Sequence, residues 1–158
     1  MSPATRTWAM AAFVALLGVA AFLVSRAWPV LFPDREQLPV DPACDLRAGP
    51  CSRVLPDGTR LAFTIRPRSL PLMQPLALEV ELAGSEVAEV QVDIVGLNMN
   101  MGPNRTRLEP VGAGRWRGTT LLPVCSARVM QWEAAVWLSR GGRILAIPHR
   151  FETRRSGT

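Results

Sequence analysis

Residues 129–139 read VMQWEAAVWLS, and this stretch decides the fold of the chain. Successive side chains of a β-strand point to opposite faces of its sheet, so strict alternation predicts a half-buried strand. The pair Gly141-Gly142 that follows is typical of a two-residue hairpin turn, which returns the chain as a further strand over 144–153. The apolar face of the first strand would carry Met130, Trp132, Ala134, Val136 and Leu138, and the other face Gln131, Glu133 and Ala135.

The same period of two recurs upstream. It is carried by three sets of apolar residues: Leu61, Phe63 and Ile65; Leu76, Leu78, Val80 and Leu82; and Val90, Val92 and Ile94. After residue 24 no helical pattern is found. We therefore predict an all-β fold, an immunoglobulin-like antiparallel β-sandwich of about seven strands over 58–153, with a polar tail over 154–158.

The alternation slips by one residue at Val95-Gly96. A slip of this kind at a glycine predicts a β-bulge, and bulges often lie beside functional sites. The predicted strand would continue with Val95, Leu97, Met99 and Met101 on one face. Further strands are expected over 106–109 and 115–122, joined through 111–114.

The N-terminal segment is apolar. Residues 8–24 form a run of 17 residues without a charge, flanked by Arg6 and Arg26. As a helix, residues 7–25 would measure about 28 Å, close to the hydrocarbon thickness of a bilayer. Two interpretations stay open: an uncleaved signal anchor over 1–27, or a signal peptide cleaved near 25–27. The length favours the anchor, with residues 8–24 in the lipid bilayer of the inner membrane as a transmembrane helix.

Six prolines crowd residues 28–57, and proline fixes φ and lacks an amide donor. We expect an extended spacer that holds the domain away from the membrane. Cys44 and Cys51 lie within it at a spacing that fits neither a thioredoxin motif nor a zinc ribbon. A local disulfide is the first interpretation, a redox pair or metal ligands the others. The disulfide would place the C-terminal domain in the periplasm, an oxidising compartment.

Charge is uneven along the chain. Up to Val95 there are 8 Arg and 10 acidic residues; from Gly96 on there are 10 Arg and 3. An Arg-rich half indicates either an anionic partner or a solvated surface, and a membrane leader argues against nucleic acid. The chain has one His, no Lys and no Tyr, and no carboxylate pair suited to acid–base catalysis. We predict that it is not an enzyme.

Four sulfur-bearing residues gather in one region of the sequence: Met99, Met101, Cys125 and Met130. Thioether and thiolate ligands select Cu(I) over zinc and hard cations, so these residues are the candidate metal ligands. Trp132 would share a face with Met130 and shield such a site. The alternative is that the methionines fill the core. His149 is expected at a strand edge, with a role as a metal ligand as the alternative.

The segments NMNMG over 98–102 and LPVC over 122–125, followed by Met130 and Trp132, resemble a group of single-pass bacterial membrane proteins. More broadly, the architecture over 57–152 resembles the FixH and YtkA-like domains. That resemblance implies an immunoglobulin-like sandwich on a membrane anchor that assists copper delivery to, or assembly of, a respiratory cytochrome oxidase. The Met/His and C-x-x-x-C patterns of known respiratory copper chaperones do not occur here.

Two other functions stay open from the sequence. One is a metal-free interaction domain that binds a membrane complex through the Arg-rich C-terminal half. The other is a redox partner that depends on Cys44 and Cys51.

Overall fold

The computed structural model describes residues 3–31, 34–84, 86–124 and 126–154. The chain divides into two compact units, 1–34 and 35–158. The first unit contains helix α1 (Pro3–Leu31), 29 residues long. In the part of the chain that the structure describes, no helix combines the length and the apolar character needed to cross a membrane.

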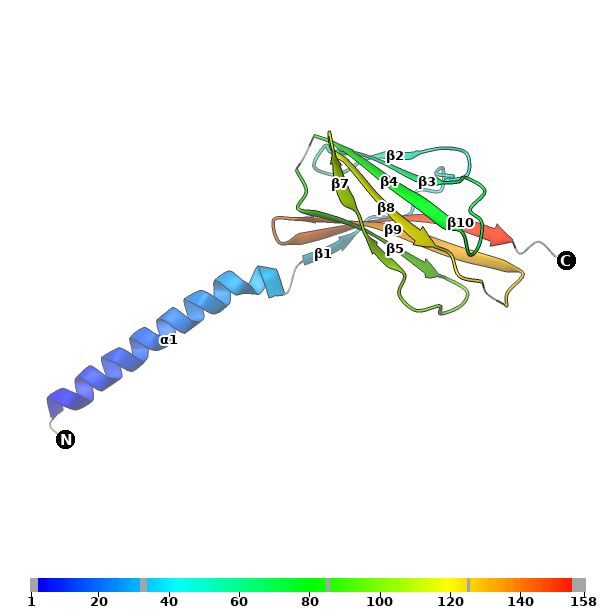
Figure 1. Ribbon diagram of the computed structural model, residues 1–158. Coiled ribbons are helices and arrows are strands. Elements are labelled where there is room, and N and C mark those ends of the chain that lie inside the picture. Colours follow the sequence, from blue (N-terminus) through cyan, green and yellow to red (C-terminus); the bar gives the residue numbers. More distant parts are fainter. Residues whose placement is uncertain (1–2, 32–33, 85, 125, 155–158) are drawn as a thin grey trace. The chain divides into compact units, whose positions relative to one another are not determined.

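The second unit is built from two five-stranded sheets (Figure 1). One sheet has the order β1-β10-β9-β5-β6 and the other β2-β3-β4-β8-β7. The strands are β1 (Asp34–Gln37), β2 (Cys51–Val54), β3 (Arg60–Arg66), β4 (Pro75–Ala83), β5 (Glu89–Gly96), β6 (Arg105–Arg107), β7 (Glu109–Gly112), β8 (Arg115–Leu121), β9 (Val129–Arg140) and β10 (Arg143–Arg154). The mostly-β class is confirmed, whereas about seven strands were predicted and ten are described.

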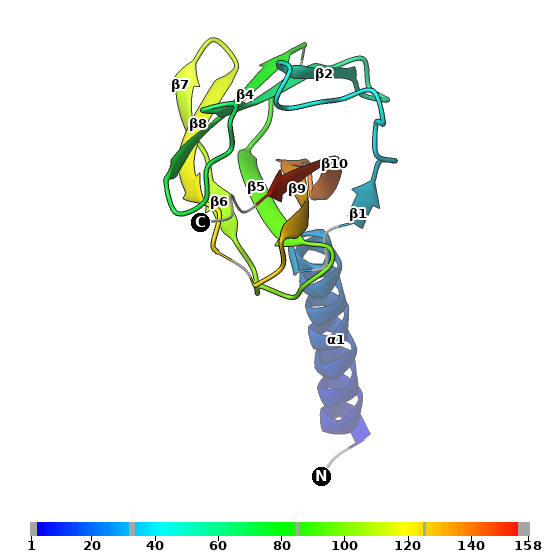
Figure 2. The same ribbon diagram turned by 90° about the vertical axis from the view of Figure 1, so that its right-hand side faces the viewer.

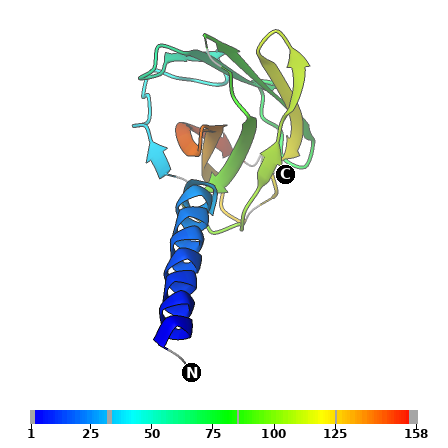
Figure 3. The same cartoon turned by 90° about the vertical axis from the view of Figure 1, so that its left-hand side faces the viewer.

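The core lies between the two sheets, which face one another when the unit is viewed along its strands (Figures 2 and 3). The apolar face predicted for each alternating strand is the buried face, so the period of two identified the core correctly. In β9 this face comprises Met130, Trp132, Ala134, Val136 and Leu138. The turn at Gly141-Gly142, both with positive φ, joins β9 to β10 in the predicted antiparallel register.

The predicted spacer over 28–57 does not stand apart from the domain. Its first residues complete α1, and β1 and β2 lie within it at one edge of each sheet. An edge strand leaves half of its backbone groups unpaired in the ladder, so it tolerates nearby prolines better than a central strand does. Leu46 and Leu55 are buried in the core. The predicted Cys44–Cys51 disulfide is confirmed, with the two Cα atoms 5.3 Å apart.

The bulge predicted at Val95-Gly96 is wrong. β5 keeps its register with β9 as far as the pair Gly96–Trp132 and then ends. Residues 97–104 form a loop. The physical reason is that side-chain amides of this loop, described below, take over the hydrogen bonds that a continued strand would have made.

The strand predicted over 106–109 is divided between the sheets. β6 pairs with β5, whereas β7 pairs with β8 in the opposite sheet. Leu108 stands between them, fully buried, and its main-chain N–H donates to the carbonyl oxygen of Val90 over 2.9 Å. The chain therefore crosses the core edge at this leucine.

Candidate functional site

Three loops meet at one end of the sandwich. They follow β3, β5 and β8 (residues 67–74, 97–104, and 122–124 with 126–128), and β10 ends at the same end (Figure 1). Antiparallel neighbours alternate in direction, which brings these connections together. The main-chain N–H of Met73 donates to the carbonyl oxygen of Leu122 over 2.8 Å and so ties the first loop to the third.

Asn98 fastens the second loop to the start of β9. Its Nδ2 donates to the carbonyl oxygen of Val129 over 2.9 Å, and its Oδ1 accepts from the main-chain N–H of Gln131 over 3.1 Å. The main-chain N–H of Leu97 donates to the carbonyl oxygen of Gln131 over 2.8 Å. One amide side chain thus copies the pairing of a strand residue.

Asn104 fastens the other end of that loop to β8. Its Nδ2 donates to the carbonyl oxygen of Leu121 over 2.8 Å, and its Oδ1 accepts from the hydroxyl of Thr120 over 3.0 Å. Between the two fixed ends, Oδ1 of Asn100 accepts from the main-chain N–H of Gly102 and closes a local turn. The side chains of Asn98, Asn100 and Asn104 therefore fix the conformation of the loop through hydrogen bonds.

Two methionine side chains meet at Gly96. A β-carbon added to this glycine would lie 2.8 Å from Cε of Met130 and 3.4 Å from Cγ of Met101. It would also lie 2.5 Å from the carbonyl oxygen of Met99. Cε of Met130 and Cγ of Met101 therefore both lie close to the same point beside Gly96. Because Gly96 has no side chain, there is space for both methionine side chains there.

The three methionines lie at different depths. Met130 is 2% exposed and belongs to the core, as the core-filling alternative expects. Met101 is half-buried and packs against the core, and Met99 is 37% exposed. The fourth predicted ligand, Cys125, lies outside the described residues. The structure thus places Met101, in the loop 97–104, beside Met130 of β9. Met99 lies in the same loop as Met101.

The sequence analysis predicted His149 at a strand edge, and this prediction is wrong. β10 lies between β1 and β9 in its sheet, and His149 points toward the opposite sheet, where it stacks on Phe63 of β3. His149 is 3% exposed, and its cross-strand partner is Ala134, four residues from Met130. At the rise of a strand this separation is about 13 Å, which sets His149 apart from the methionines. Burial lowers its pKa to about 4.

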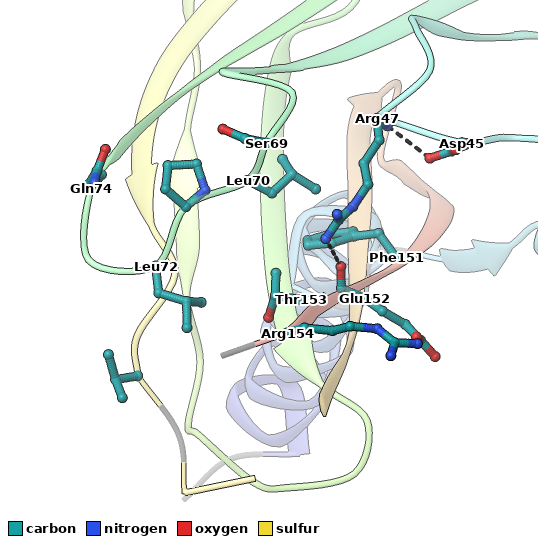
Figure 4. A pocket seen from close by; sticks show the side chains of 12 residues that line it. Asp45, Arg47, Ser69, Leu70, Leu72, Gln74, Phe151, Glu152, Thr153 and Arg154 are labelled. Carbon is teal, nitrogen blue, oxygen red and sulfur yellow. Dashed lines mark hydrogen bonds between the residues drawn. The ribbon is translucent and has the colours of Figure 1, made fainter. Parts of the chain in front are cut away.

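A cleft of about 760 Å³ opens at the same end of the sandwich (Figure 4). One wall is the loop with Leu70 and Leu72, and the other is the end of β10 with Phe151 and Thr153. The guanidinium of Arg47 reaches over this end of β10 and donates to the carbonyl oxygen of Glu152. The cleft therefore has an apolar floor and a charged rim.

Half of the arginines in the Arg-rich half of the sequence lie beside acidic residues. Five of its arginines form ion pairs, and four of the five acidic partners come from the acidic first half: Arg105–Asp93, Arg107–Glu89, Arg117–Glu79, Arg140–Asp57 and Arg150–Glu133. The sheet pairings interleave the two halves, so much of the charge asymmetry along the chain cancels in space. Arg105 also lies 4.5 Å from the ring centroid of Trp137.

Among the described residues, no group of three or more His, Cys, Asp or Glu side chains is arranged to hold a metal ion. Comparison of the chain with models of protein families, with curated proteins and with solved structures gave no match.

Proposed function

We propose that this protein is a membrane-attached periplasmic domain that binds Cu(I) as cargo and assists its delivery to, or the assembly of, a respiratory oxidase. The observation that carries the copper proposal is the meeting of the Met101 and Met130 side chains at Gly96. The oxidase and the immunoglobulin-like relationship rest on the resemblance to the FixH and YtkA-like domains.

The donor set suits Cu(I). Thioethers are soft ligands that prefer this ion to zinc, calcium or magnesium. Met101 and Met130 would supply two thioethers, Met99 a third, and Cys125 is the further candidate. Met99 is the most exposed of the three candidate methionine ligands, so it is the ligand best placed to exchange copper with a second protein.

Membrane attachment would come from α1. Its uncharged run over 8–24 carries large apolar side chains that are more than half exposed, among them Phe13, Leu16 and Phe22. Exposing such side chains to water is unfavourable, and transferring them to lipid would lower the free energy. The Cys44–Cys51 disulfide fits an oxidising compartment and therefore a periplasmic domain.

The copper proposal is tested by anaerobic titration of the detergent-solubilised full chain with Cu(I) against a competing chelator. We expect one Cu(I) per chain, and Met101→Leu and Met130→Leu should each weaken binding at least about tenfold, equivalent to about 1.4 kcal/mol. Leucine keeps the volume and apolar character of methionine without its sulfur, so the fold should persist. Met73→Leu, at the same end of the sandwich, is the matched control and should bind as the wild type does.

A wild-type protein that takes up no copper in the presence of micromolar chelator would contradict the proposal. The metal-free interaction domain would then take its place. The location is tested separately: a reporter active only in the periplasm, fused after Thr158, should be active, and the protein should stay with the membrane fraction after alkaline extraction.

A further inference from the structure

The segment between β1 and β2 lies along β10 as a strap, which we define as residues 38–50. Near its start, the main-chain N–H of Leu38 donates to the carbonyl oxygen of Ala146 over 2.9 Å. Farther along, the guanidinium of Arg47 donates to the carbonyl oxygen of Glu152. Ala146 and Glu152 stand three residues before and three residues after His149, so the two attachments bracket this histidine.

His149 points into the core beneath the strap. Its imidazole stacks on Phe63 of β3, with ring centroids 5.2 Å apart and planes inclined by 21°. Neither ring nitrogen has a hydrogen-bond partner among the described residues. A buried imidazole that makes no hydrogen bond tolerates the neutral form far better than the charged form. His149 is the only histidine in the chain.

The charged groups around His149 come from few elements. The positive charge of Arg53 in β2 disfavours protonation of His149, and the negative charge of Asp41 in the strap favours it. β3 presents Phe63, and β9 presents Ala134, whose neighbour Glu133 pairs with Arg150. The charged side chains of β1 (Asp34, Arg35 and Glu36) are exposed.

The strap is held more lightly than the strands beside it. Besides the contacts to Ala146 and Glu152, the guanidinium of Arg53 donates to the carbonyl oxygen of Pro39 over 2.7 Å, and that of Arg68 to the carbonyl oxygen of Ala48 over 3.1 Å. Leu46 is its apolar anchor in the core. By contrast, β9 pairs with β10 over twelve residues.

We propose that the strap is a proton-sensitive closure: acidification charges His149, and residues 38–50 separate from β10 while the two sheets stay folded. The imidazole nitrogens have no acceptor among the described residues, and Asp41 of the strap is the carboxylate that favours the charged form. The Cys44–Cys51 disulfide ties the middle of the strap to the first residue of β2, so Cys44 would stay beside β2 while the rest of the strap leaves β10. Separation would withdraw Arg47 from the rim of the cleft and expose Leu46. This inference is independent of copper binding.

Hydrogen exchange of the full chain in detergent, followed by mass spectrometry, tests the proposal. After correction for the intrinsic effect of pH on exchange, the opening of peptides from 38–50 should rise roughly twentyfold between pH 7 and pH 5, if the open state has an ordinary histidine pKa. Peptides of β9 should keep their protection. His149→Phe, which preserves an aromatic ring against Phe63 and does not titrate, should abolish the change in the strap.

Three results would overturn the proposal. The first is a strap that stays equally protected at both pH values. The second is an opening that His149→Phe leaves unchanged. The third is a simultaneous loss of protection in the strap and β9, which would mean unfolding of the whole domain. If His149→Phe does not fold, NMR titration of the single histidine replaces it: ring signals that titrate near the ordinary value without opening of the strap would equally contradict the proposal.

Discussion

The indole Nε1 of Trp132 donates a hydrogen bond to Oγ1 of Thr153 across 2.8 Å inside the core. Trp132 is almost wholly buried and has no access to water that could replace this acceptor. Thr153→Val keeps the shape and removes the acceptor, so it should lower the free energy of unfolding by about 1–3 kcal/mol. Urea denaturation measures the change. Thr119→Val, on the exposed face of β8, is the control and should have almost no effect.

Gly96 makes room for the methionine cluster. In Gly96→Ala the new methyl group would clash with the carbonyl oxygen of Met99 and with Cε of Met130. We expect a loss of about 1–3 kcal/mol in unfolding free energy and a weaker affinity for Cu(I), measured by urea denaturation and chelator competition. Gly49→Ala has open space around the added carbon and should change neither quantity by much. Equal losses in both variants would contradict the role given to Gly96.

Asn98 holds the methionine loop against β9 through two hydrogen bonds. Asn98→Ala should increase hydrogen exchange in residues 97–104 and weaken Cu(I) binding, because Met99 and Met101 would lose their fixed positions. The comparison variant is Asn100→Ala, which removes a single hydrogen bond within the loop. A smaller effect of Asn98→Ala than of Asn100→Ala would show that the attachment to β9 is unimportant.

Asp57 and Arg140 join the turns of the two sheets at the opposite end of the sandwich through a 2.6 Å ion pair. A hydrogen bond from the main-chain N–H of Thr59, and then the Arg140 guanidinium, lower the pKa of Asp57 below its ordinary 3.8. The folded pKa is thus below the unfolded one, so the charge stabilises the fold above the ordinary pKa. That contribution is lost as the pH falls through the folded value.

Asp57→Asn keeps the acceptor for Thr59 and removes the charge. Because this pair is largely solvent-exposed, screening limits the expected loss at pH 7 to about 0.5 kcal/mol. The difference between the wild type and the variant should shrink as the pH falls below 3.8 and through the lowered folded pKa of Asp57, which chemical denaturation at several pH values measures. A difference that persists in acid would mean that the charge is not the cause. Glu86→Gln, on an exposed residue, is the control.

The disulfide fixes the strap that carries Leu46 into the core. Changing both Cys44 and Cys51 to Ser should lower the free energy of unfolding by about 2–3 kcal/mol, because the unfolded chain regains freedom. Hydrogen exchange should increase most in residues 38–50. Peptide mapping without reduction should recover Cys44 linked to Cys51 and Cys125 as a free thiol. A link to Cys125 would remove that residue as a copper ligand.

The sequence by itself determined the long alternating strands, their buried faces and the hairpin at Gly141-Gly142. These follow from local rules: side chains alternate along a strand, and two glycines accommodate a tight turn. The Cys44–Cys51 bridge was also predictable, since only six residues lie between these two cysteines and the third, Cys125, is distant in sequence. The four sulfur-bearing residues could be nominated from their chemistry and proximity in sequence.

Only the tertiary structure decided where the prolines of 28–57 and the sulfur atoms lie. Whether a short segment becomes a spacer or an edge strand depends on the sheet edge beside which it lies. β1 and β2 are too short to show a pattern of alternating apolar residues that would predict this. The bulge prediction failed because the amide of Asn98 hydrogen-bonds β9 as a main chain would, which alternation cannot reveal. His149 is buried because its side chain faces the opposite sheet and stacks on Phe63 of β3, which is distant in sequence. The methionines meet because β5 ends beside β9 at a glycine, a contact that sheet pairing creates.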